Sequence, residues 1–118
     1  MGRDARAIIG AMSASHDITA EVTSWPGVEG GPGRRGEFSF RVGRREIGHL
    51  HGDRAAHFFF PKDLWADLFA AGRVVHHPVF PDKDGPAARR IAGEDDVRDV
   101  IALMRLNYDR VVAKHGLP

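Results

Sequence analysis

The chain has 118 residues, of which 42% are hydrophobic and 28% charged, as expected for one globular domain with a single core. Its net charge of +1 argues against a nucleic-acid-binding protein, because such proteins carry a marked excess of Lys and Arg. The absence of cysteine excludes disulfides, cysteine-ligated zinc, iron–sulfur clusters and thiol nucleophiles. No apolar run of the sequence approaches the ~20 residues of a membrane-spanning helix. We therefore expect a cytoplasmic protein without membrane association.

The first predicted element is a helix that ends at Pro26-Gly27. The sequence leaves open whether this helix is broken near Gly10 or capped again at Asp17. We expect residues 1–16 to be a helical extension of a core domain that covers about 17–115, and the glycine-rich stretch 29–36 to be a loop. Six residues recur at steps of three and four, which is typical of one helix face: Ile8, Met12, Ser15, Ile18, Val22 and Trp25.

Three strands and a second helix are predicted in the middle of the chain. Apolar and polar residues alternate over 37–43, which predicts a strand, and 45–52 follows as its hairpin partner. A third strand is predicted over 54–60, and its aromatic run becomes a candidate interface if the middle residue, Phe59, faces solvent. Pro61 fits the first turn of the next helix, because its missing N–H would be unpaired there.

The last third of the chain predicts two strands and a long helix. Pro78 makes 73–80 an edge strand, and 87–92 is a short strand. The helix over 93–116 has acidic residues in its first turn and basic residues in its last, which suits the helix dipole. Its expected core stripe consists of Val97, Val100, Ile101, Met104, Tyr108 and Val111.

The order of these elements, α-β-β-β-α-β-β-α, predicts a single α+β domain. Its sheet is expected to be mostly antiparallel and five-stranded, with the helices packed mainly on one face. An antiparallel sheet of this kind can leave its other face open to water.

The histidines of "GHLHGD", residues 48–53, are the most informative feature for function. Strand alternation places His49 and His51 on one face. This is the buried face, which Ile47 is expected to share with Phe38 and Phe40, and Glu46 lies on the opposite face. The candidate pocket comprises His49, His51, His76, His77, Asp53 and Tyr108.

Two interpretations of these histidines compete. A zinc site needs three or four ligands, and His57 is available as a third, but no complete ligand pattern such as HExxH is present. Partly buried, hydrogen-bonded histidines are the simpler interpretation, so we expect no metal and no cofactor. An enzyme that uses His49 or His51 as a general acid or base requires a carboxylate that orients the ring.

Several motifs occur in an order that resembles the small bacterial and fungal proteins of the luciferase domain family. They are "WPGV", "REIGHLHGDR", "FFFPKDLWADLFAAGRVVHHPVFPD" and "EDDVRDVIALMRLNYDR", which together cover about residues 17–112. The residues that match the family pattern are Gly48, His49, His51, Phe60, Pro61, His76 and His77.

The resemblance implies a shared fold and a shared pocket, and it implies no light emission. One stretch departs from the family pattern, because Asp84-Gly85-Pro86 stands where serine, glycine and tryptophan are expected. Any pocket wall formed by that tryptophan is altered here.

Three functions follow as hypotheses. The first is a binding or regulatory domain for a small molecule or a protein partner, with a histidine-lined pocket. The second is an enzyme that uses a strand histidine, with its catalytic residues still unknown. The third is a winged nucleic-acid-binding module, which only the β-β-α-β-β order and the arginine-rich loops favour. The sequence leaves the oligomeric state open.

Overall fold

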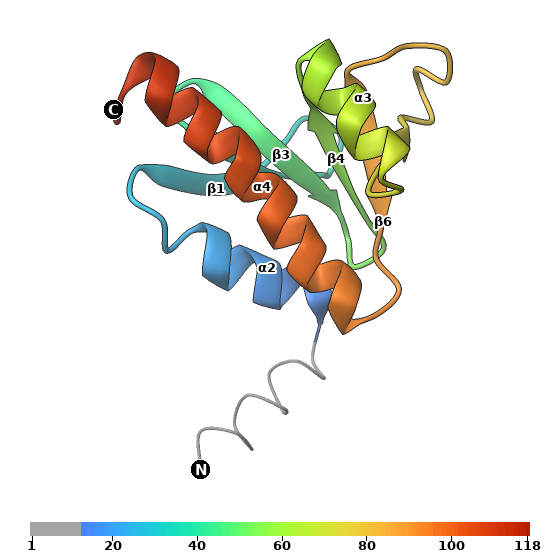
Figure 1. The fold of residues 1–118 in the computed structure, drawn as a ribbon. Coiled ribbons are helices and arrows are strands. Elements are labelled where there is room, and N and C mark those ends of the chain that lie inside the picture. Colours follow the sequence, from blue (N-terminus) through green and yellow to red (C-terminus); the bar gives the residue numbers. More distant parts are fainter. Residues whose placement is uncertain (1–12) are drawn as a thin grey trace.

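The long C-terminal helix α4 (Glu94–His115) crosses one face of an antiparallel β-sheet (Figure 1). A computed structural model describes residues 13–118 of the chain. Helix α2 (Ala14–Val22) packs beside α4, and α3 (Lys62–Ala70) lies over the far end of the sheet (Figure 1). The domain is therefore α+β, with three helices within the described residues.

The sheet has six strands in the order β1-β2-β3-β4-β6-β5, and each neighbouring pair is antiparallel. The prediction of five strands was wrong by one. The strands are β1 (Val28–Pro32), β2 (Phe38–Val42), β3 (Arg45–His51), β4 (Ala55–Phe59), β5 (Val75–His76) and β6 (Pro86–Arg90).

The additional strand is β1, which forms in the stretch that we predicted as a loop. Its glycines allow close approach to β2, since a Cβ on Gly30 would lie 2.7 Å from the Phe38 ring. Pro32 ends β1 at the edge of the sheet, where its missing N–H costs no ladder hydrogen bond. The predicted strand over 73–80 is confirmed as an edge strand but is only two residues long.

Helix α2 begins at a Ser13 cap rather than at Asp17, because the Ser13 side chain accepts a hydrogen bond from His16 N. Within the expected stripe, Ile18, Val22 and Trp25 are buried. Ile8 and Met12, like the possible break at Gly10, lie outside the described residues.

The core lies between the sheet and helices α2 and α4. The predicted stripe of α4 is largely confirmed: Val100, Met104, Tyr108 and Val111 are buried, whereas Val97 and Ile101 are only partly buried. Asn107 is also buried in this face, which the apolar pattern did not predict.

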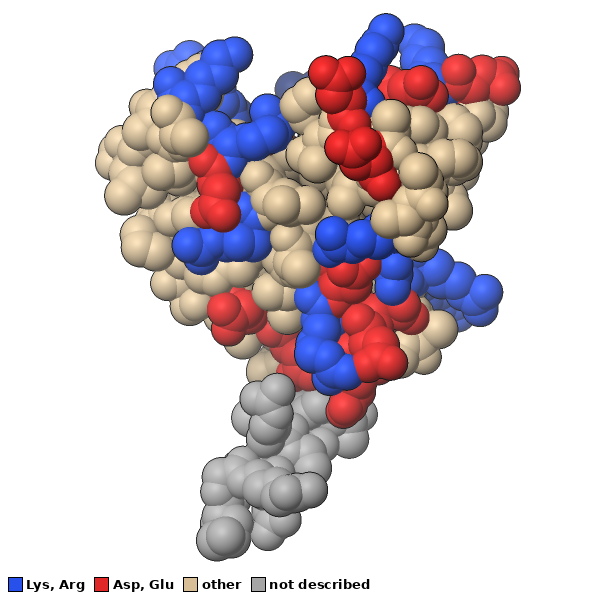
Figure 2. Space-filling view, viewed as in Figure 1, with Lys and Arg blue, Asp and Glu red and all other residues tan. Residues whose placement is uncertain are grey.

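Charged side chains tie the start of α4 to the sheet. Arg89 on β6 bonds the carboxylates of Asp96 and Asp99 at 2.6 and 3.0 Å, and Arg73 also bonds Asp99. On the face that carries α2 and α4, the acidic and basic side chains of the described residues are interspersed and form no single basic patch (Figure 2). Among the described residues, no helix is both long and apolar enough to cross a bilayer.

Candidate functional site

A bulge in β3 decides which face of the sheet carries the histidines. Phe40 lies opposite Gly48, but the next residue, Arg41, lies opposite Glu46, so Ile47 is an extra residue in β3. A bulge of this kind reverses the alternation of the strand on one side of it. Ile47 and Gly48 therefore both belong to the core side.

The expected placement of His49 and His51 on the Phe38 and Phe40 face was wrong for this reason. Ser39 pairs with His49, whereas Phe38 pairs with Leu50. Because directly paired residues share a face, the histidines lie on the face opposite the phenylalanines. This face is the one that α2 and α4 leave open.

The same bulge brings Glu46 beside His49, which corrects the expectation that they lie on opposite faces. His49 Nδ1 lies 2.8 Å from Glu46 Oε2, and the Ser39 hydroxyl donates to Glu46 Oε1 at 2.7 Å. Burial works to raise the pKa of the Glu46 carboxyl, but the hydrogen bonds from His49 and Ser39 outweigh it and hold the pKa below its usual value. An ionised Glu46 accepts a hydrogen bond from the Nδ1–H group of His49, so Nε2 of His49 carries the free lone pair.

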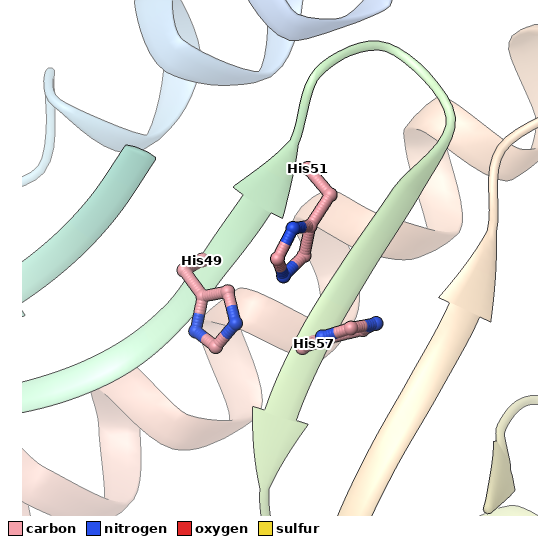
Figure 3. A group of neighbouring side chains, drawn as sticks. All are labelled: His49, His51 and His57. Carbon is pink, nitrogen blue, oxygen red and sulfur yellow. The ribbon is translucent and has the colours of Figure 1, made fainter. Parts of the chain in front are cut away.

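His57 on β4 completes a group of three imidazoles with His49 and His51 (Figure 3). His57 pairs directly with His49 across the β3–β4 ladder. The ring centroids of His51 and His57 are 4.3 Å apart, and those of His49 lie 5.0 and 5.3 Å from the other two. One ligand nitrogen from each residue falls within 4.8 Å of the others.

His57 is buried without a hydrogen-bond partner. Only 8% of the residue is exposed, and its Nδ1 has no partner within the structure. Burial, followed by the charges of His77, His51 and His49, lowers the pKa of His57 to about 4. A buried polar atom without a partner costs about 1–3 kcal/mol, so such an atom calls for a bound water, an ion or another ligand.

The two histidines of the later pair point to opposite faces of the sheet. His77 lies against His57, with ring centroids 4.1 Å apart, and its Nδ1 accepts a hydrogen bond from Val79 N. His76 instead packs beneath α3 against Trp65. The structure therefore brings His77, but not His76, to the cluster of His49, His51 and His57.

The remaining two predicted pocket residues have structural contacts elsewhere. Asp53, in the turn after β3, accepts a hydrogen bond from Ser15 N at 2.8 Å and so fixes the start of α2. The Tyr108 hydroxyl donates to Pro26 O at 2.7 Å, and its ring packs against Trp25 on the helix-covered side. The structure places neither residue in the histidine cluster.

A groove of about 850 Å³ borders the histidine cluster on the open face. This volume falls in the usual range for small-molecule sites. Phe59 is 69% exposed and Phe80 41%, so the sequence was right to single out Phe59 as a possible exposed apolar position. The lining relevant to binding is formed by His49, His77, Phe59, Phe80, Lys62 and Lys83.

Fold and site together define an α+β domain that carries a histidine cluster and a groove on its open sheet face. The family model of the luciferase domain matches residues 44–107, which is more than half of the chain. The chain therefore belongs to the luciferase domain family, as the motifs indicated. The matched residues include the histidine cluster, α3 and the groove. No curated protein and no solved structure matches the chain.

Proposed function

We propose that this chain is a small-molecule-binding domain and that its site is the histidine-lined groove on the open sheet face. The observation that carries the proposal is the exposure of Phe59 and Phe80 in a groove of about 850 Å³, beside imidazoles that donate and accept hydrogen bonds. Apolar walls with a few convergent polar groups are typical of ligand sites.

The lining indicates the class of ligand. Phe59 and Phe80 offer aromatic surfaces to a flat, mainly apolar body. Two lysines, Lys62 and Lys83, and three carboxylates line the same groove, so its charges nearly cancel and do not select a strongly anionic or cationic molecule. The carboxylates are Glu46, Asp82 and Asp84. A largely apolar molecule with one or two hydrogen-bonding groups fits this lining best.

The stretch that departs from the family pattern contributes to the same groove. Asp84 and Pro86 both line it, where a tryptophan is expected in other members of the family. We expect this wall to be smaller and more polar here, so the preferred ligand differs from that of a member that carries the tryptophan.

Binding of the fluorescent probe anilinonaphthalene sulfonate to the full chain tests this proposal. We expect saturable binding, with NMR shifts at the amides of His49, Phe59 and His77. Phe59→Ser removes the exposed aromatic wall and should weaken binding at least about tenfold, or ~1.4 kcal/mol. Leu117→Ser is the matched control, because Leu117 is 54% exposed but lies outside the groove.

Two results would contradict the proposal. One is equal affinity in the wild-type and Phe59→Ser proteins. The other is a set of shifts confined to the separate apolar hollow between α2 and β2, which Thr19 and Phe38 line.

A second candidate function is an enzyme that uses His49 as a general acid or base. The observation in its favour is the 2.8 Å contact between His49 Nδ1 and Glu46 Oε2, because a carboxylate in this position orients an imidazole for proton transfer. Acylation of His49 by diethyl pyrocarbonate, followed by mass spectrometry, tests this role. We expect slower acylation of His49 in Glu46→Gln, and an unchanged rate would count against it.

A further inference from the structure

We propose that His49, His51 and His57 form a binding site for a divalent transition metal of the zinc class on the open face of the sheet. One ligand nitrogen from each of these residues lies within 4.8 Å of the others. Tetrahedral zinc with Zn–N bonds of 2.0–2.1 Å holds its ligand nitrogens about 3.4 Å apart. Small ring rotations close the difference, because the backbone already sets the three side chains side by side.

The sheet supplies the positions of the ligands. His49 and His51 are two residues apart on β3 and therefore share a face, and His57 is the direct partner of His49 on β4. Ligands on paired strands are held more rigidly than ligands on loops. The bulge at Ile47 turns His49 and His51 away from the core and onto the open face, which also carries His57 of β4.

The buried nitrogen of His57 is an independent indication of a ligand. The residue is more than nine-tenths buried, and its Nδ1 has no hydrogen-bond partner among residues 13–118. The ring lies beside those of His49 and His51 rather than alone in the core (Figure 3). A metal bound among the three rings would provide the partner that this nitrogen lacks.

Glu46 and Ser39 form the outer support that a metal-binding histidine usually has. Glu46 accepts from Nδ1 of His49, and Ser39 holds the second oxygen of the same carboxylate. This arrangement fixes the His49 tautomer and directs the Nε2 lone pair away from Glu46. Carboxylate–histidine–metal arrangements of this kind orient the ligand and raise its basicity.

The donor set determines the class of metal. Three neutral imidazoles suit Zn²⁺, Cu²⁺ and Ni²⁺, whereas Mg²⁺ and Ca²⁺ require oxygen ligands. Three protein ligands leave a fourth position for water or a ligand, as in catalytic rather than structural zinc sites. Since His49 also lines the groove, this position is close to the proposed small-molecule site, but metal binding does not depend on that proposal.

Calorimetric titration of the chelator-stripped full chain with zinc chloride tests the site. We expect one zinc per chain, and a tetrahedral visible spectrum when cobalt(II) replaces zinc. His57→Ala and His51→Ala should each weaken zinc binding at least about a hundredfold. His51 is exposed, so its removal tests the site even if His57→Ala fails to fold, which circular dichroism will show.

Two further variants separate a built site from adventitious binding by surface histidines. His76→Ala is the matched control, because it also removes one histidine but from a position beneath α3, away from the cluster. Its zinc affinity should equal that of the wild type. Glu46→Gln should weaken zinc binding about 10- to 100-fold. The proposal fails if zinc does not bind, or if His51→Ala binds zinc as tightly as the wild type.

Discussion

Asn107 is a buried polar side chain whose amide group holds the bulge of β3 against α4. Its Nδ2 donates to the carbonyls of Ile47 and Phe59, both at 3.2 Å. Ile47 is the bulged residue, so its carbonyl falls outside the regular ladder and takes its partner from the helix. One amide on α4 therefore supports the strand geometry that brings Glu46 beside His49.

We expect Asn107→Ala to lower the free energy of unfolding by about 1–3 kcal/mol, because it removes the donor from the buried Ile47 carbonyl and from the partly buried Phe59 carbonyl. Urea denaturation measures the change. Arg98→Ala is the control, since Arg98 forms an exposed pair with Asp95 on the same helix and should contribute less than about 1 kcal/mol. Equal losses in the two variants would show that Asn107 does not hold the bulge.

At the scale of elements, α4 is the helix against which the sheet packs. Met104 is fully buried, and Gly48 of β3 makes room for it, since a Cβ on Gly48 would lie 2.5 Å from the Met104 sulfur. Met104→Ala should therefore cost about 2–5 kcal/mol in urea denaturation. Ile101 is only partly buried, so Ile101→Ala should cost less. A larger loss for Ile101 than for Met104 would contradict this packing.

The edge strand β1 offers two adjacent glycines as a matched pair. A Cβ on Gly30 would lie 2.7 Å from the Phe38 ring, whereas a Cβ on Gly31 meets nothing within 4 Å. We expect Gly30→Ala to lower stability by about 1 kcal/mol, because the Phe38 ring must move. Gly31→Ala should be neutral or slightly stabilising, since alanine restricts the unfolded chain. Equal thermal unfolding of the two variants would contradict the close packing of β1.

Hydrophobic periodicity predicted most elements but could not detect the bulge. The alternation of Phe38, Phe40 and Val42 is regular and fixed β2 correctly. In β3, alternation placed His49 and His51 on the wrong face because Ile47 is an extra residue. A single inserted residue moves each later side chain of the strand to the opposite face. Periodicity also failed to predict β1, because its glycines give no apolar alternation. This strand is recognised by its backbone pairing with β2.

At the scale of the whole molecule, the candidate site depends on pairings between distant residues. The spacing of His49 and His51 indicated two imidazoles on one face, and the structure keeps them together. That His57 is the cross-strand partner of His49 follows only from the β3–β4 register. Burial of His57 without a partner requires the packed structure as well. The sequence therefore identified the histidines as candidates but not which three of them converge. For this reason we expected, from the sequence, a site without a metal.

Metal-free protein should lose stability in mild acid because of His57. The pKa of His57 is lowered from 6.5 to about 4 by burial, then by His77, His51 and His49, and the carboxylate of Glu46 in the same site is not sufficient to reverse this shift. In the unfolded chain His57 binds a proton below pH ~6.5, whereas in the folded chain it binds one only below about pH 4. The free energy of unfolding therefore has its full value above pH ~6.5. It falls as the pH decreases toward 4, by on the order of 3 kcal/mol in total.

Urea denaturation with chelator present, at pH values between ~7 and ~4, measures this loss. His57→Gln is neutral throughout the range, so its stability should fall less steeply between pH ~6.5 and ~4. A smaller slope should remain in this variant, because partial burial, followed by the charges of His49 and His51, also lowers the pKa of His77. The carboxyls of Glu46 and Asp53, whose pKa values are lowered in the fold from 4.5 and 3.8, add a loss of stability only at the acidic end of this range, below pH ~4.5. Identical pH profiles for the wild type and His57→Gln would show that His57 is not buried as a neutral imidazole.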